Sequence, residues 1–359
     1  MSIESLRKAL GTRLPIVQAP MANSTPPELV AAACEAGALG SIGAPYFAAA
    51  DITAAAEAVR ARTARPFAIN LFLPGSPAPA DPAATERART ILDRARRELG
   101  LPLDPPPAPA RDGFDAQFEA ALRARPAVFS FTMGVLDRDR VGALHAAGTV
   151  LVGTATTPEE GEALEAAGVD VVCAQGAEAG GHRGSFLVPT DDGLWGVLAL
   201  VQQLAGRVRV PVLAAGGIMD GRGVAAALLA GASGVQMGTA FLACRESGAP
   251  TAHKAALCSP AARRTVLTRA FSGRHARAIA NAYTDAFGAL AVPPFPAFQG
   301  MTRDVRIGAA RAGRIEWMQM FAGQNAAMSR DLPAAELVKA VVAEANEALG
   351  AASALRLVP

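Results

Sequence analysis

The chain has 359 residues, of which 51% are hydrophobic and 18% charged, and these proportions exclude a disordered chain. The formal net charge of +2 and the aromatic content of 5% argue against a nucleic-acid partner and against a charged membrane surface. The start of the chain contains an early acid and no long apolar run, and no uncharged stretch is long enough to span a membrane, so we expect a cytoplasmic protein.

Short apolar runs alternate with Ala-rich helical segments along the chain. A first strand is predicted at 14–20, and a helix over 26–36 follows it, with Thr25 as N-cap and Pro26 at the first helical position. Seven further strands are predicted at 38–43, 66–70, 127–130, 149–153, 169–175, 210–217 and 233–238. Because most of these runs are continuously apolar, they indicate parallel strands buried on both faces. Eight such units in series predict a (β/α)8 TIM barrel.

The predicted helices have recognisable ends. Thr157, before Pro158, and Asp220 are expected to cap the starts of two helices. Four glycines that precede strands are expected to end the helices before them, namely Gly37, Gly148, Gly168 and Gly231.

Two segments interrupt this rhythm. Residues 74–113 follow the third strand and contain a predicted helix at 83–99 and a proline run at 104–110, which we interpret as a stiff surface loop. Residues 243–297 follow the eighth strand and indicate a small α+β subdomain with a hairpin turn at Ser272-Gly273. The predicted domains are therefore a barrel of residues 1–242 and 298–359, and an inserted subdomain of residues 243–297.

Uncharged polar residues mark the ends of several predicted strands. They are Gln18, Asn70, Ser130, Gln175 and Gln236. The active site of a barrel lies at the C-terminal ends of its strands. Amide side chains carry both donors and acceptors, so this set suits a ring system edged with C=O and N–H groups.

Glycine-rich loops follow strands seven and eight, where phosphate is often bound in this fold. The segments are AAGGIMDGRG (214–223) and GVQMGTAF (234–241). Gly216 and Gly217 allow backbone N–H groups to approach an anion, and Gly238 and Thr239 add further donors. We expect a phosphate-bearing cofactor here.

His182 is the candidate proton acceptor, because it follows strand six between Gly180-Gly181 and Gly184. An imidazole with an ordinary pKa near 6.5 accepts protons at neutral pH. The other histidines, which are His145, His253 and His275, are interpreted as structural or surface residues.

The sequence contains no obvious nucleophile or metal site of its own. Its four cysteines form no CxxC pair and are interpreted as reduced thiols at positions 34, 173, 244 and 258. No cluster of His and carboxylate residues has metal-ligand spacing. A barrel of this kind usually takes its reactivity from a cofactor.

Several motifs together resemble the nitronate monooxygenase family, formerly called 2-nitropropane dioxygenases. They are QAPMA (18–22), INLF (69–72), CAQGAEAGGHRG (173–184), AAGGIMDGRG (214–223), QMGT (236–239) and FAGQNA (321–326). The resemblance implies an FMN enzyme that oxidises alkyl nitronates with O₂ to a carbonyl compound and nitrite, without NAD(P)H. Neutral nitroalkanes are a further candidate substrate.

The resemblance also implies roles for individual residues. His182 would be catalytic, as a base when neutral and as a holder of the nitronate when protonated. FMN would be bound by Asn70, Gln175, Gly180, Gly217, Gln236, Met237, Gly238 and Thr239, and Met21 would pack near its ring. The expected partners are a small nitronate or nitroalkane and O₂, with no metal, nucleic acid or membrane; a homo-oligomeric state is left open.

Three alternatives stay open at this point. FMN-dependent NAD(P)H enoyl-acyl-carrier-protein reductases share the GGH and glycine-loop motifs, although INLFLP and the late AGQ favour the monooxygenase. Purine-nucleotide dehydrogenase barrels need a rim cysteine after strand six, which this sequence lacks. A flavin-binding barrel with an idle His182 is the third. Phe321 stands where the family often has Trp or Tyr, which leaves the substrate open.

Overall fold

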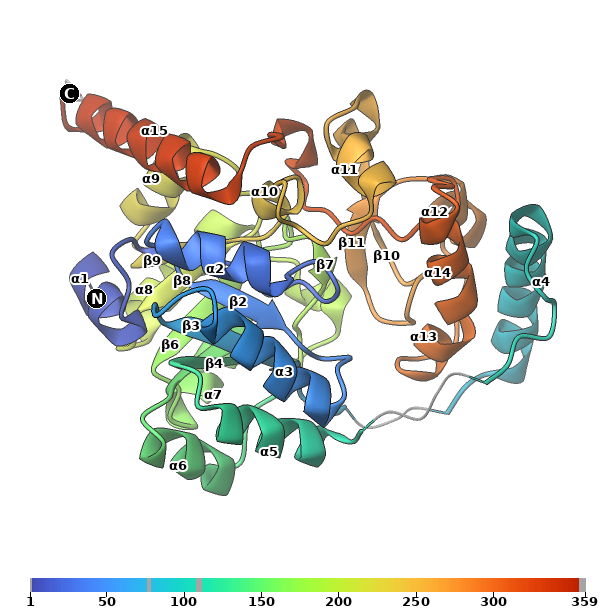
Figure 1. Cartoon of the computed structure of the whole chain (residues 1–359), viewed down its shortest axis with the longest axis horizontal. Coiled ribbons are helices and arrows are strands. Elements are labelled where there is room, and N and C mark those ends of the chain that lie inside the picture. Colours follow the sequence, from blue (N-terminus) through green and yellow to red (C-terminus); the bar gives the residue numbers. More distant parts are fainter. Residues whose placement is uncertain (1, 76–78, 108–111, 355–359) are drawn as a thin grey trace.

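The computed structural model of the protein describes residues 2–75, 79–107 and 112–354, and its centre is a parallel barrel (Figure 1). The strands are β1 (Ile16–Gln18), β2 (Gly40–Gly43), β3 (Phe67–Phe72), β4 (Val128–Thr132), β5 (Val150–Ala155), β6 (Val171–Gln175), β8 (Val212–Ala215) and β9 (Gly234–Met237). They pair in the order β1-β9-β8-β6-β5-β4-β3-β2, and a parallel bridge between Val17 and Leu39 closes the ring. The predicted TIM barrel and all eight of its strands are confirmed.

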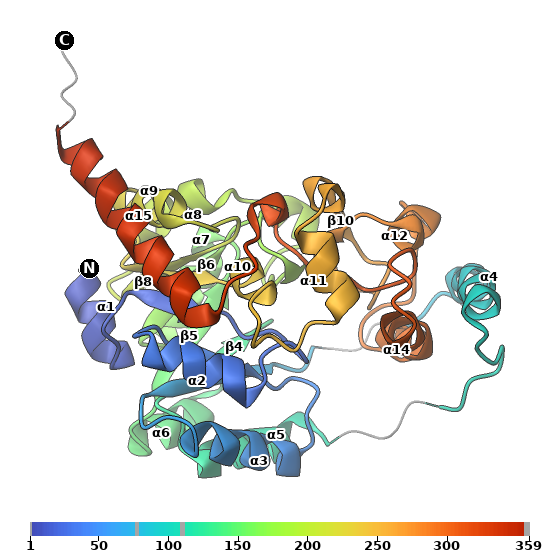
Figure 2. The ribbon, with the colours of Figure 1, turned by 45° about the horizontal axis from the view of Figure 1, so that its top comes forward.

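Helices surround the barrel on its outer face. They are α2 (Pro27–Glu35), α3 (Ala49–Arg60), α5 (Phe114–Ala124), α6 (Arg138–Ala146), α7 (Pro158–Ala166), α8 (Val197–Arg207), α9 (Gly221–Leu229) and α15 (Ala334–Ala354). Helix α1 (Ile3–Leu10) closes the N-terminal end of the barrel, where Leu6 and Leu10 pack against inward-facing strand residues such as Val17 and Val128, and α10 (Thr239–Leu242) follows β9 at the opposite end. The C-terminal α15 packs along α9 and α2 (Figure 2). None of the helices within the described ranges is long and apolar enough to cross a membrane.

Most predicted helix ends are confirmed. Thr157 and Asp220 cap α7 and α9 with their side chains, and Gly37, Gly148, Gly168 and Gly231 all have positive φ after a helix. The prediction for α2 is wrong, because Pro26 is the N-cap and Pro27 begins the helix. A residue before proline is held out of the helical region, so the Pro26-Pro27 pair delays the start by one residue. Thr25 instead accepts a hydrogen bond from the Gly43 amide at 2.9 Å.

Gln18 completes the barrel at the seam between β1 and β2. The Gln18 amide donates to the Leu39 carbonyl at 2.8 Å. Past Gln18, side-chain hydrogen bonds replace the backbone pairing between the two strands. Gln18 Oε1 accepts from the Ser41 amide at 2.9 Å, and Nε2 donates to the Ala19 carbonyl. Gln18 is fully buried. Its polar atoms therefore serve closure of the barrel and are not available to a ligand.

A second hydrophobic cluster lies beside the barrel and includes the predicted hairpin. It is built from β10 (Thr265–Thr268), β11 (Ala276–Ile279), α11 (Thr251–Leu257), α12 (Ala282–Phe287), α13 (Ala297–Met301) and α14 (Arg303–Arg311). The turn between β10 and β11 contains Gly273 with φ +85°. The boundaries of this subdomain at 243 and 297 stay a prediction.

Helix α4 (Pro82–Leu99) lies on the side of this cluster that faces away from the barrel, beside α14 (Figure 1). Its buried Arg96 forms two hydrogen bonds to the Asp304 carboxylate at 2.8 and 3.1 Å. The Trp317 indole donates to the Glu98 carboxylate at 2.8 Å. The helix predicted at 83–99 is thus confirmed, while the proline run predicted at 104–110 lies partly outside the described residues.

The contact between α9 and α15 gives a test of the packing. A methyl group added at Gly221 meets the Ala345 backbone nitrogen at 2.1 Å, whereas one at Gly142 in α6 meets nothing within 4 Å. We expect Gly221→Ala to lower the free energy of unfolding by about 1–3 kcal/mol. Gly142→Ala should raise it by about 0.5–1 kcal/mol, because alanine favours a helix interior. Urea unfolding of both variants measures this; equal effects would contradict the packing.

Candidate active site

His182 lies on a short strand that joins the barrel to the subdomain. This strand, β7 (Gly181–His182), follows β6 and pairs antiparallel with β11, so that His182 lies opposite Ala276. Gly181 has φ +73°, a conformation that favours glycine and turns the chain towards the hairpin. The three-stranded sheet β10-β11-β7 therefore brings the subdomain over the C-terminal end of β6.

The imidazole of His182 has a hydroxyl partner on one side. Its Nε2 lies 2.8 Å from the Oγ of Ser272, which is fully buried. The same hydroxyl is 3.4 Å from the Arg274 carbonyl, to which it can donate. From this network we assign the ring proton to Nε2, so that Ser272 accepts from Nε2 and Nδ1 is left as a proton acceptor. Three aromatic rings lie within 6.1 Å of the imidazole, those of Phe72, Phe295 and Phe321.

His182 is neutral at physiological pH. Burial, together with the guanidinium charges of Arg274 and Arg306, lowers the pKa of His182 to about 3. Within the described residues, no carboxylate bonds to the ring to oppose this shift. The imidazole is therefore unprotonated at pH 7 and cannot hold an anion by its own charge, and the same burial and cations make it a weaker base than a free imidazole.

The backbone around His182 is fixed from the barrel side. The Gln175 side chain donates to the His182 carbonyl at 3.0 Å and accepts from the Gly184 amide at 2.8 Å. Arg183 is fully buried, and its guanidinium donates to the carbonyls of Gln175 and Gly176 at 3.0 and 2.6 Å, and to that of Gly193 at 3.2 Å. The Gln175 amide, expected to face the flavin ring, thus already holds the histidine loop.

Two other predicted ligands keep polar atoms available. The Asn70 side chain donates to Ser130 Oγ at 2.9 Å across β3 and β4. In the described parts of the chain no donor reaches Asn70 Oδ1, and no partner bonds to the half-buried Gln236 side chain of β9. Both can therefore bond to a ligand at the rim.

The late AGQ segment (322–324) and the residues after it bond to two of the glycine loops and pack against the third. A methyl group at Gly180 would lie 2.6 Å from the Gly323 backbone nitrogen, so only glycine allows this approach. The Gly323 amide donates to Thr239 Oγ1 at 2.8 Å, and the Asn325 side chain donates to the Gly217 carbonyl at 2.8 Å. The loops after β6, β8 and β9 thus meet at one junction, which explains why these distant motifs occur together.

Backbone amides at this junction are free to bind an anion. Gly217 has φ +69°. Across the described residues, no acceptor takes the amides of Gly217, Gly238 or Thr239. Met21 lies beside this point, with its sulfur 3.7 Å from where a methyl on Gly238 would be. Met237 is buried in the barrel core, so its side chain does not face a ligand.

A cavity of about 530 Å³ lies on the subdomain side, and Phe295 in its wall has its ring centre 6.1 Å from that of His182. Apolar residues form much of its wall, which comprises Leu73, Gly75, Met133, Ser185, Phe186, Val188, Pro189, Thr190, Asp191, Arg269, Gly273, Arg274, His275, Pro294 and Phe295. The sequence had indicated His275 as structural or surface; it lines this cavity with its Nε2 3.7 Å from Asp191. Sequence reasoning also missed Ser272 and Arg274, since they belong to the insertion and carry no motif.

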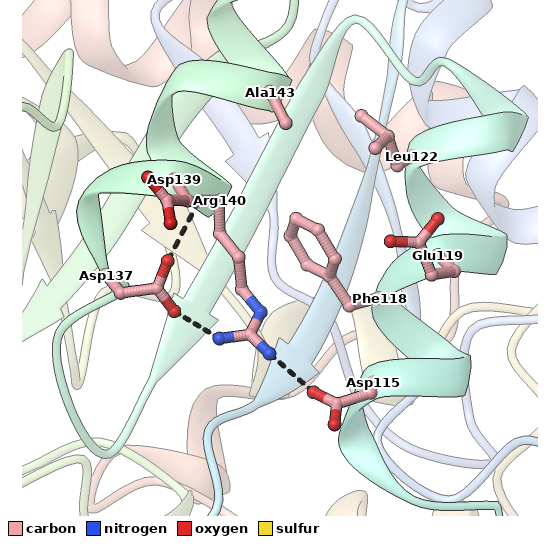
Figure 3. A pocket seen from close by; sticks show the side chains of 8 residues that line it. All are labelled: Asp115, Phe118, Glu119, Leu122, Asp137, Asp139, Arg140 and Ala143. Carbon is pink, nitrogen blue, oxygen red and sulfur yellow. Dashed lines mark hydrogen bonds and ion pairs between the residues drawn. The ribbon is translucent and has the colours of Figure 1, made fainter.

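A second hollow, of about 420 Å³, lies between α5 and α6 on the outside of the barrel (Figure 3). Arg140 spans it with ion pairs to Asp115 and Asp137, and its guanidinium lies 5.6 Å from the Phe118 ring. Asp137 also caps α6. Because these charged groups already pair with one another, we interpret them as holding α5 against α6 and not as a ligand-binding site.

Comparison with known proteins decides between the alternatives. The sequence model described as nitronate monooxygenase matches residues 4–344. The chain belongs to the nitronate monooxygenase family. A nitronate monooxygenase from Pseudomonas aeruginosa is 44% identical, with 94% of this chain and 97% of that protein aligned. One from Paraburkholderia phytofirmans is 41% identical, with 96% of each aligned. The protein is therefore an enzyme, a flavin-dependent oxidoreductase, as the motifs predicted.

Solved structures agree with this assignment to the nitronate monooxygenase family. A nitroalkane oxidase from Streptomyces ansochromogenes superposes with a TM-score of 0.90 at 44% identity, covering 97% of this chain and 99% of that one. FabK from Thermotoga maritima superposes with a TM-score of 0.73 at 26% identity, covering 97% of both chains. The higher likeness of the first favours the monooxygenase over the reductase alternative.

The neutral state of His182 can be tested by titration. The NMR signals of the His182 ring, assigned by their loss in His182→Gln, should keep their neutral shifts between pH 8 and pH 5. The reason is that burial and nearby cations hold the pKa of His182 at about 3. A midpoint near the ordinary value of about 6.5 would contradict the assigned environment.

Proposed function

We propose that this protein is an FMN-dependent enzyme that oxidises alkyl nitronates with O₂ to a carbonyl compound and nitrite, without NAD(P)H. Neutral nitroalkanes are its second candidate substrate class. The observation that carries the proposal is the position of His182, whose Nε2 lies 2.8 Å from Ser272 Oγ, two residues after the Gly180 that packs against Gly323 at the junction of three glycine loops. The cytoplasmic location stays a prediction from the sequence, and a homo-oligomeric state stays open.

The residues at the junction fit a flavin mononucleotide. The free amides of Gly217, Gly238 and Thr239 form a single group that suits one phosphate. Asn70 Oδ1 and the Gln236 amide offer an acceptor and donors to the ring edge, while Met21 offers an apolar contact. Gly180 and Gln175 act indirectly, because they hold the loop that forms this side of the site. When bound, FMN supplies the electron acceptor and the reaction with O₂.

His182 and the surrounding rings provide the remaining chemistry. With a nitroalkane, Nδ1 removes the proton from the carbon that bears the nitro group, while Nε2–H stays bonded to Ser272. With a nitronate this proton is already gone, so His182 needs only to position the substrate. Phe72, Phe295 and Phe321 exclude water and accept an alkyl chain.

Oxygen uptake by the purified yellow protein tests the proposal. With propyl-2-nitronate we expect rapid uptake that does not depend on NADH. His182→Ala should keep its flavin and lose turnover of neutral 2-nitropropane by at least about 100-fold, the usual contribution of a general base. His145→Ala is the matched control, because His145 is exposed on α6 and pairs with Asp170.

Two outcomes would contradict this account. Bleaching of the flavin by NADH, with no uptake on nitronate, would support the reductase. Loss of flavin from His182→Ala would make His182 a structural residue.

A further inference from the structure

A neutral His182 leaves the source of positive charge for an anionic nitronate unassigned. The arginines around β7 are placed to supply it. Arg183, Arg269, Arg274 and Arg277 donate to backbone carbonyls of the loop and hairpin. Within the described residues, none of these four has a carboxylate oxygen within 4.0 Å. Their charges are therefore not neutralised by a contact ion pair.

Among these, Arg274 is connected to His182 through a shared partner, Ser272. Its backbone amide lies 3.3 Å from Ser272 Oγ, the group that bonds to His182. Its Nε donates to the Arg183 carbonyl at 2.9 Å and its Nη2 donates to the Ser185 carbonyl. No protein acceptor in the described ranges takes its other N–H groups, and the side chain lines the 530 Å³ cavity. A guanidinium stays charged even when burial lowers its pKa, as it does here.

The cavity as a whole favours a small anion. Arg269 and Arg274 line it, against one carboxylate, that of Asp191, whose side chain is 77% exposed to solvent. Much of the remaining wall is apolar, including Phe295, whose ring centre lies 6.1 Å from that of His182. Arg274 is itself partly buried, and a partly buried charge attracts an anion more strongly than a fully solvated one.

We infer that Arg274 is a specificity-determining residue: its guanidinium holds the anionic nitronate group beside His182 and makes the site prefer the nitronate over the neutral nitroalkane. This inference rests on the proposed function. It assigns the two tasks of the site to different residues, with proton removal at His182 and anion binding at Arg274.

Binding of inorganic nitrate, a planar anion that resembles the nitronate group, tests the inference without turnover. The Kd of the holoenzyme for nitrate is measured by calorimetry. Arg274→Gln should weaken binding about tenfold or more, the usual size of a lost charged hydrogen bond. Arg274→Lys should stay within about threefold, because it keeps the charge. Arg264→Gln, which removes an exposed arginine paired with Asp285, should leave the Kd unchanged.

A kinetic comparison and a crystal soak complete the test. Arg274→Gln should lower kcat/KM for propyl-2-nitronate at least about tenfold more than that for 2-nitropropane. Equal losses of kcat/KM for both substrates, or equal loss of nitrate binding in the Gln and Lys variants, would make Arg274 merely structural.

If Arg274→Gln does not fold, wild-type crystals soaked in nitrate give the answer, since nitrate bound away from Arg274 overturns the inference. Nitrate binding that depends on Arg274 in a protein inactive on nitronates would reject the proposed function and keep the anion site.

Discussion

The antiparallel pairing of β7 with β11 is the interaction on which the candidate active site depends. His182 lies opposite Ala276 in this ladder, and the turn before β11 places Ser272 Oγ 2.8 Å from the imidazole. The barrel fixes the same strand from the other side, through the Gln175 amide and the Arg183 guanidinium. One proton-accepting unit is thus formed by two residues that are 90 positions apart in the sequence.

The charges around this unit are bonded mainly to backbone groups. Arg183 and Arg274 donate to carbonyls, and buried Glu160 accepts from the amides of Phe186 and Leu187. Because backbone dipoles satisfy these charges without an opposite charge in contact, their field persists in the low-dielectric interior. The field of the arginines favours a neutral imidazole and an anionic ligand at the same time, so one arrangement accounts for both proposed roles.

The barrel and its glycine loops could be predicted because their signals are local. Continuous apolar runs mark buried parallel strands, and positive-φ positions such as Gly217 call for glycine. Thr25 failed as a cap because two prolines follow it. Ser272 and Arg274 were missed for a different reason, since they carry no motif of their own and only the β7–β11 ladder brings them to His182. Gln18 shows the opposite error. Its place at a strand end suggested a ligand contact, but its side chain closes the barrel.

On the proposed function, bound FMN would take its electrons from the substrate that His182 and Arg274 hold, and not from a nicotinamide. The most direct measurement is the visible absorbance of the yellow protein mixed, without O₂, with either propyl-2-nitronate or NADH. We predict that the nitronate bleaches the flavin within a turnover and that NADH leaves it oxidised on the same timescale. Bleaching by NADH and none by the nitronate would contradict the account.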